Sequence, residues 1–109
     1  MQNREVLEKL QQILIERKQA SADESYVASL YSKGLDHILK KVGEESSEVI
    51  IAAKGSDTIA LTKEVADLWF HCMVLLVSKE LDFNDVLTEL DRRFGVSGLE
   101  EKASRTLNK

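Results

Sequence analysis

The sequence predicts an all-α protein in which about four to five helices form a bundle of one domain, residues 1–109. Proline is absent, the alternation of apolar and polar residues that is typical of strands is scarce, and apolar residues recur at helical spacing almost throughout. The length is sufficient for one modest hydrophobic core.

The first two expected helices occupy the N-terminal third of the chain. An apolar stripe over residues 6–14 predicts a helix that ends near Arg17. Asp23 or Ser25 can cap a short second helix that continues through Tyr31, because both side chains can accept a hydrogen bond from a free amide of the first turn. A glycine follows and breaks this helix.

Glycines and aspartates separate the remaining helices. The third is expected over residues 35–54, between two glycines. Asp57 caps a fourth helix that continues to about Leu81, and Asp82 caps a fifth that continues through Arg93. The tail contains two glycines and then a short helical turn.

The fourth helix is apolar on nearly all sides along VADLWFHCMVLLV. A helix of this kind must be covered on two sides, and a chain of 109 residues has few helices to spare for this. We therefore expect a homodimer whose interface includes this helix and completes the bundle. A core formed within one chain is the alternative.

Composition and charge exclude several classes of protein. The net charge of −4 argues against a general nucleic-acid binder, and no run approaches the ~18 apolar residues of a membrane span. The charged, helix-patterned N-terminus does not resemble a signal peptide. Cys72 is the only cysteine and cannot form an intrachain disulfide, so a reduced, cytoplasmic compartment is expected.

Two acidic clusters are the strongest functional signal. Glu44, Glu45 and Glu48 lie in the third expected helix, and Glu64 and Asp67 lie in the fourth. Residues three or four apart share a helix face, where like charges repel. A hard divalent cation would offset that repulsion, since Mg²⁺ prefers carboxylate and water oxygens and often accompanies a phosphorylated substrate. Two solvated acidic faces are the alternative.

The short link between these helices makes them antiparallel neighbours. Glu45 and Glu48 then face Glu64 and Asp67, and the four carboxylates can converge on one or two cations. Glu44 faces further outward. The ligand set consists of oxygens only, which favours Mg²⁺ or Mn²⁺ over iron or zinc.

Other side chains are candidates for binding substrate. His71 could orient a carboxylate or touch substrate, although a hydrogen-bonded histidine without a chemical role is the simpler interpretation. Several basic side chains could hold phosphates, with ordinary surface solvation as the alternative for each. The candidates are Lys33, Lys40, Lys41, Lys54, Arg92, Arg93, Lys102 and Arg105.

The two clusters resemble the signature of the MazG-like, all-α nucleoside triphosphate pyrophosphohydrolases. The surrounding sequence is similar to that of the phosphoribosyl-ATP pyrophosphatase family over residues 25–105. The segments that carry this similarity are SYVASLYSKGLDHILKKVGEESSEVIIAAK, EVADLWFHCMVLL and RRFGVSGLEEKASR. Trp69 stands where a tyrosine is common in the family, and Ser46 where alanine is common.

This resemblance implies metal-dependent hydrolysis of phosphoribosyl-ATP to phosphoribosyl-AMP and pyrophosphate, the second step of histidine biosynthesis. We expect Glu45, Glu48, Glu64 and Asp67 to hold the metal, and Glu44 to orient the attacking water or to act as an outer carboxylate. The basic residues and His71 would contact the substrate.

Two other functions fit part of the sequence. A house-cleaning pyrophosphatase acting on ordinary or damaged nucleoside triphosphates would need the same acidic clusters. A non-catalytic, dimeric helical adaptor would explain the apolar helix but would leave the carboxylates without a role. Pyrophosphate release that depends on metal separates enzyme from adaptor, and a substrate panel separates the two enzymes.

Overall fold

The computed structural model describes residues 2–94, 102 and 105, and this part of the chain is helical, with no strand. The prediction of an all-α fold is confirmed. The elements are α1 (Asn3–Glu16), the short 3₁₀ helix η1 (Arg17–Gln19), α2 (Tyr26–Lys33), α3 (Leu35–Lys54), α4 (Thr58–Ser78) and α5 (Phe83–Arg93).

The helix starts follow the capping residues of the sequence. Ser25, rather than the alternative Asp23, caps α2 by accepting a hydrogen bond from the amide of Ala28. Asp57 accepts from two amides at the start of α4. Asp82 forms a capping box at the start of α5. These caps satisfy amides that have no partner within their helices.

One predicted boundary is wrong. The sequence predicted that the fourth helix continues to about Leu81, but α4 ends at Ser78. Glu80 adopts a left-handed backbone conformation with φ of 59°, which cannot continue a right-handed helix. A second positive φ, 96°, lies at Gly34, where the chain turns from α2 into α3. Glycine has no Cβ to oppose that conformation.

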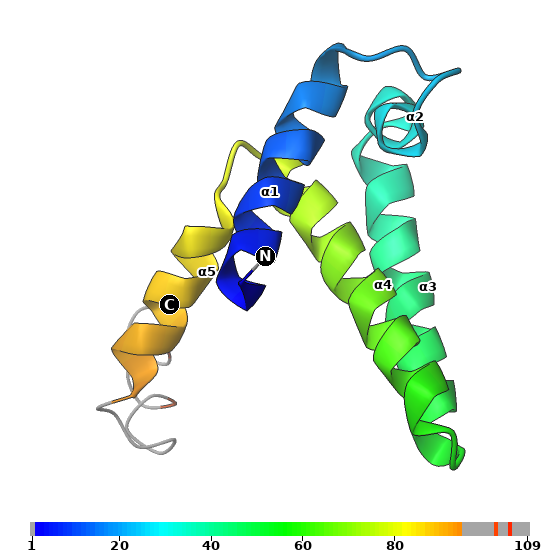
Figure 1. Cartoon of the computed structure of the whole chain (residues 1–109), viewed down its shortest axis with the longest axis vertical. Helices are drawn as coiled ribbons and strands as arrows, with labels where there is room; N and C mark the ends of the chain where they lie inside the picture. Colours follow the sequence, from blue (N-terminus) through cyan, green and yellow to red (C-terminus); the bar gives the residue numbers. More distant parts are fainter. Residues whose placement is uncertain (1, 95–101, 103–104, 106–109) are drawn as a thin grey trace.

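The fold is organised around α3 and α4, an antiparallel pair that makes the most extensive helix contact in the structure (Figure 1). The core lies at the end of this pair that α1 and α2 cover. Its fully buried side chains are Leu14, Leu30, Ile38 and Val74. Towards the other end, Ile50 and Ile51 are each 66% exposed, so one chain covers only part of the pair.

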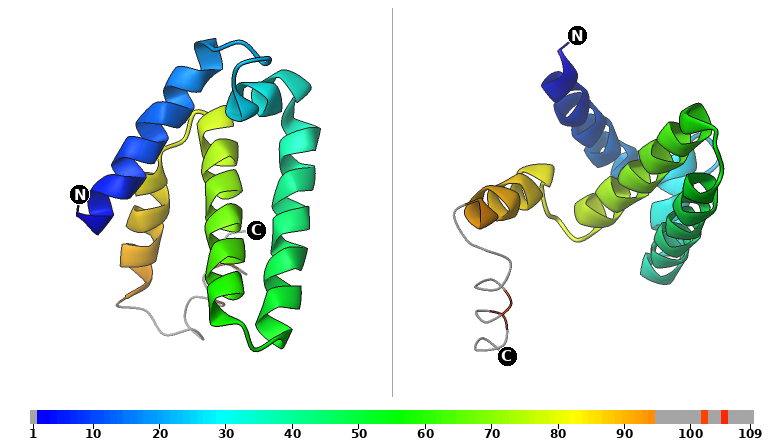
Figure 2. Two further views of the ribbon diagram at one scale, coloured as in Figure 1. Left: turned by 45° about the vertical axis from the view of Figure 1, so that its right-hand side comes forward. Right: turned by 90° about the horizontal axis from the view of Figure 1, so that it is seen from below.

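Helix α5 lies beside α1 and away from α3 (Figure 2). Gln11 of α1 anchors its start, because it donates to Asp82 at 2.7 Å and accepts from the amide of Phe83 at 2.8 Å. The Cα radius of gyration is 16.4 Å. A compact domain of this size would have about 13 Å. Among the described helices, none is both long and apolar enough to cross a membrane.

Candidate metal centre

Three of the predicted carboxylates converge between α3 and α4. Glu45 comes from α3, and Glu64 and Asp67 come from the first three turns of α4. One carboxylate oxygen of each lies within 4.8 Å of the others. Glu45 and Glu64 are partly buried and Asp67 is exposed, so the group is open to solvent on one side. The short connection after Gly55 makes this convergence possible, because it returns the chain antiparallel to α3.

The negative charges of this carboxylate group lie close together and repel one another. The pKa of Glu64 is raised, first by partial burial and then by the negative charges of Glu48, Asp67 and Glu45. Glu48 is outside the group of three oxygens but acts on Glu64 through its charge. Four of the five predicted carboxylates therefore form one electrostatic unit.

The donor set fits a hard divalent cation. Oxygens on opposite sides of an Mg²⁺ ion are about 4.2 Å apart, since each Mg–O bond is about 2.1 Å. The 4.8 Å limit within the group of three is close to that span, so small side-chain rotations would bring these oxygens onto one ion. The donors are carboxylates only, which suits Mg²⁺ or Mn²⁺ better than zinc.

Glu44 faces away from this group and pairs with lysines of its own helix. Its carboxylate lies 3.3 Å from Nζ of Lys41 and 3.9 Å from Nζ of Lys40. The same Lys41 ammonium is 3.7 Å from Glu45. The hydrogen bond that Lys41 donates to Glu44 is the largest cause of the raised pKa of Lys41. Lys41 therefore carries a full positive charge at the edge of the carboxylate group.

His71 lies one turn after Asp67 on α4 and is buried. Its Nδ1 lies 2.8 Å from the Asp67 carbonyl oxygen, which can only accept, so Nδ1 carries the proton. Its Nε2 then accepts from the Tyr26 hydroxyl, also at 2.8 Å. Both ring nitrogens are engaged within the chain. This geometry supports the orienting or structural role of His71 rather than direct contact with substrate.

The other basic candidates lie further from the carboxylates. Lys33 and Lys54 occupy the last turns of α2 and α3, where a cation interacts favourably with the helix dipole. Arg93 donates to Glu89 of its own helix at 3.2 Å. Lys102 and Arg105 are exposed helical residues, and most of the predicted phosphate-binding tail lies outside the described residues.

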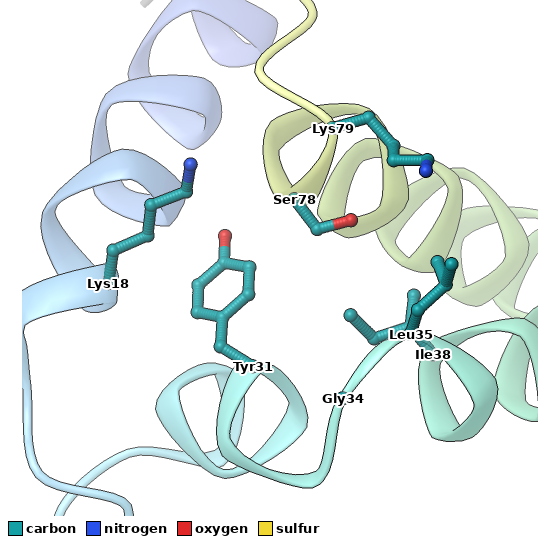
Figure 3. Close-up of a pocket in the computed structure, with 7 residues that line it drawn as sticks. All are labelled: Lys18, Tyr31, Gly34, Leu35, Ile38, Ser78 and Lys79. Atoms are coloured by element: carbon teal, nitrogen blue, oxygen red, sulfur yellow. The ribbon is translucent and has the colours of Figure 1, made fainter.

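A separate cavity of about 410 Å³ lies at the end of the α3–α4 pair that α1 and α2 cover. Lys18 and Lys79 line it from opposite sides, with Tyr31 and Ser78 between them (Figure 3). The Tyr31 hydroxyl donates to the Leu14 carbonyl, and burial raises its pKa to about 12. Among the described residues, no carboxylate lines this cavity, so its volume does not make it the site of metal chemistry.

Comparison with known sequences identifies the family of the chain. The sequence model of the phosphoribosyl-ATP pyrophosphohydrolase family matches residues 7–94. This chain belongs to that family. A phosphoribosyl-ATP pyrophosphatase of Methylococcus capsulatus is 59% identical over 103 residues, which cover 94% of this chain and 98% of that protein. Proteins of the same name from Ruthia magnifica and Neisseria gonorrhoeae are each 57% identical over 101 residues, covering 93% of this chain and 96% and 94% of their own lengths.

The segment that matches the phosphoribosyl-ATP pyrophosphohydrolase family contains all five predicted carboxylates, while Lys102 and Arg105 lie beyond it. Tyr26 was not among the site residues predicted from the sequence. No spacing rule marks it, since it follows the cap of α2 and is remote in sequence from both acidic clusters. Only the packing of α2 against α4 brings its hydroxyl to His71.

Proposed function

We propose that this chain hydrolyses phosphoribosyl-ATP to phosphoribosyl-AMP and pyrophosphate, in the second step of histidine biosynthesis. Water adds across the anhydride between the α- and β-phosphates. The observation that carries the proposal is the convergence of Glu45, Glu64 and Asp67 in a chain that belongs to the phosphoribosyl-ATP pyrophosphohydrolase family. Relatives that match over nearly their whole length carry the name of this activity.

The proposed cofactor is Mg²⁺, with Mn²⁺ as a substitute. Glu45, Glu64 and Asp67 would hold it, and Glu48 would complete the ligand set, since its charge already acts on Glu64. A bound divalent cation neutralises phosphate charge and lowers the pKa of a bound water. Repulsion among these carboxylates supports the assignment, because a cation relieves it.

The chain's own residues would handle the phosphates and the water. Lys41 holds an ammonium group 3.7 Å from Glu45, where it can pair with a phosphate oxygen next to the metal ligands. Glu44 fixes that ammonium through a contact of 3.3 Å. Of the two roles expected for Glu44, this geometry favours the outer carboxylate. Lys40, which also pairs with Glu44, would add positive charge further out.

A substrate panel tests the activity. We expect pyrophosphate release from phosphoribosyl-ATP that requires Mg²⁺ or Mn²⁺ and is abolished by chelation. The value of kcat/KM should exceed that for ATP and for damaged nucleoside triphosphates by orders of magnitude. Equal turnover of ATP and phosphoribosyl-ATP would indicate a house-cleaning enzyme instead. No turnover with any nucleotide and any divalent metal would leave the adaptor function.

The proposed assembly is a homodimer. Trp69 of α4 is 62% exposed, and Val86 and Leu90 of α5 are 43% and 46% exposed beside it. All three line an apolar groove of about 250 Å³ between α1, α4 and α5. Such a surface is unusual on a monomer, and a second subunit would remove it from water at roughly 25 cal/mol per Å² of apolar area.

Sedimentation tests this assembly. We expect a dimer at micromolar concentration and dissociation to monomer in Trp69→Glu, because a buried carboxylate without a partner is costly. The matched control is Ile15→Glu, a substitution at a residue that is 45% exposed and does not line the groove. A folded wild-type monomer at micromolar concentration would rule the dimer out.

We also place the protein in the reducing cytoplasm. Cys72 is the only cysteine of the sequence, and burial raises the pKa of its thiol, which makes it a poor nucleophile. Neither a disulfide within the chain nor a reactive thiolate is therefore expected. The net charge of −4 gives no support to binding of nucleic acid.

A further inference from the structure

Tyr26 is an aromatic side chain held in place beside the carboxylates. It is the first residue of α2, and its hydroxyl donates to Nε2 of the buried His71 at 2.8 Å. The other nitrogen of that imidazole donates to the carbonyl of Asp67, one of the three converging residues. The phenol is also an electrostatic neighbour of the Lys41 ammonium, which lies 3.7 Å from Glu45. Tyr26 is therefore connected to the carboxylate group through His71 and lies close to Lys41 at the edge of that group.

The Tyr26 ring is fixed and yet exposed. Its hydroxyl end is bound to a side chain that is only 5% exposed, while Tyr26 as a whole remains 52% exposed. A tyrosine that is only part of a packed surface has no need of a buried partner for its hydroxyl. Fixing an aromatic plane in advance removes the entropy cost of ordering it when a ligand binds.

One side of the Tyr26 ring is already used for stacking. The Phe70 ring lies nearly parallel to it, with a centroid distance of 6.4 Å and an interplanar angle of 22°. The His71 ring meets it edge-on at 83°. A flat ligand on the remaining exposed face would continue the stack that begins with Phe70.

We propose that the exposed face of Tyr26 is the surface on which the purine base of the nucleotide substrate stacks. This inference rests on the proposed function and extends it to the purine base, which carboxylates that hold a metal do not recognise. Carboxylates and lysines recognise metal and phosphate, which every nucleoside triphosphate offers. The base requires an apolar, planar partner, and Tyr26 is the fixed aromatic ring next to the charged groups.

Binding measurements with two ligands separate stacking from general damage. AMP carries a purine and pyrophosphate does not, while both bind through phosphate in the presence of Mg²⁺. Stacking of a base on an aromatic ring changes affinity by about 5- to 150-fold when the ring is removed. Calorimetry should therefore show that Tyr26→Leu raises the Kd for AMP by this factor. The Kd for pyrophosphate should stay within about twofold of the wild-type value.

Two further variants separate the ring from its hydrogen bond. Tyr26→Phe keeps the ring and loses the hydroxyl, so we expect the Kd for AMP to rise by less than about threefold. Tyr26→Gln keeps a polar group that can reach His71 and loses the ring, and it should match Tyr26→Leu. Phe94→Leu is the control, since Phe94 is an exposed aromatic residue at the end of α5, and it should leave both Kd values unchanged.

The outcomes are decisive in either direction. A loss of AMP affinity in the Leu and Gln variants, with pyrophosphate binding retained, supports stacking. An unchanged Kd for AMP, or an equal loss for AMP and pyrophosphate in Tyr26→Gln, overturns it. These measurements need no turnover. Failure of wild-type protein to hydrolyse phosphoribosyl-ATP would defeat the proposed function without deciding the role of Tyr26.

Discussion

Two groups of charged side chains in this molecule differ in how their carboxylates are compensated by positive charge. Between α3 and α4, Glu45, Glu64 and Asp67 bring negative charges together, and the pKa of Glu64 is raised. On α5, Glu89 lies between two arginines. It accepts hydrogen bonds from both of them, and its pKa is lowered to about 2.

The difference separates a site that needs a ligand from one that does not. Within the part of the chain that the structure describes, the carboxylate group is compensated only at its edge, by Lys41, so a divalent cation has a place there. On α5 the carboxylate is already compensated, since Glu89 engages Arg92 and Arg93 within one helix. The sequence predicted functional roles for the clustered carboxylates and for the two arginines, but not for Glu89. Their partners in the structure support a functional role for the clustered carboxylates far more than for the arginines.

The largest expected effect comes from neutralising a carboxylate of the first group. Asp67→Asn and Glu45→Gln should each lower kcat/KM for phosphoribosyl-ATP by at least ~100-fold, because each removes a charged oxygen ligand from the proposed metal. The free energy of unfolding without metal should not fall, since each change also removes a like-charge repulsion. Steady-state kinetics and urea denaturation measure the two quantities.

Glu89→Gln is the matched control for these variants. It replaces one carboxylate by an amide in the same way, but this carboxylate is already paired with arginines of α5. We expect its kcat/KM to stay within about twofold of the wild-type value. Near-normal turnover in Asp67→Asn at limiting Mg²⁺, or a large loss of activity in Glu89→Gln, would contradict the assignment of catalysis to the carboxylates between α3 and α4.

Metal binding should appear next as thermal stabilisation. A ligand that binds only the folded state at 100 times its Kd stabilises by about 2.7 kcal/mol. Saturating Mg²⁺ should therefore raise the Tm of the wild type and of Glu89→Gln, but not that of Asp67→Asn. An equal rise in Tm for Asp67→Asn and wild type would show that Asp67 is not a ligand of the metal.

The helices were predictable because each of their signals is local. Ser25, Asp57 and Asp82 cap the helices that they were expected to cap, and two glycines bound α3 at the expected residues. The missed boundary at the end of α4 is local too. The apolar pattern continues to Leu81, and only the backbone turn at Glu80 ends the helix earlier.

The site was predictable in part, for a related reason. Helical spacing places the acidic residues on shared faces, and a short link makes α3 and α4 antiparallel, so the convergence of Glu45, Glu64 and Asp67 follows from the sequence. The pairing of Tyr26 with His71 does not follow, because it depends on how α2 crosses the pair. The pairing of Glu89 with the arginines could have been found by its i,i+3 and i,i+4 spacing.

A smaller change in kinetics is expected when an arginine that pairs with Glu89 is removed. Arg93→Ala should raise KM for phosphoribosyl-ATP by no more than a few-fold, because its guanidinium is already engaged with Glu89 at 3.2 Å. From the sequence, Arg93 and Arg105 were predicted to hold phosphate groups of the substrate. A rise in KM that is much larger for phosphoribosyl-ATP than for ATP would restore that role.

The smallest effect is a difference in pH dependence between the two groups. Glu64 has a folded pKa above its ordinary value of 4.5, so its charge destabilises the metal-free protein at pH 7. The destabilisation disappears on acidification as the pH falls through that raised pKa. Glu89 has a folded pKa of about 2, so its ionisation stabilises the protein above pH 4.5, and this contribution is lost as the pH falls from 4.5 to 2.

The two neutral variants should therefore deviate from the wild type in opposite directions at pH 7. Without metal, Glu64→Gln should be slightly more stable than the wild type, and the difference should shrink as the pH falls from the raised pKa of Glu64 towards 4.5. Glu89→Gln should be slightly less stable, with a difference that vanishes only below pH 4.5. Both differences are small because water screens these groups. Urea denaturation across pH 7 to 3 measures these differences. Differences of the same sign at pH 7 would contradict the prediction that ionised Glu64 destabilises the metal-free protein while ionised Glu89 stabilises it.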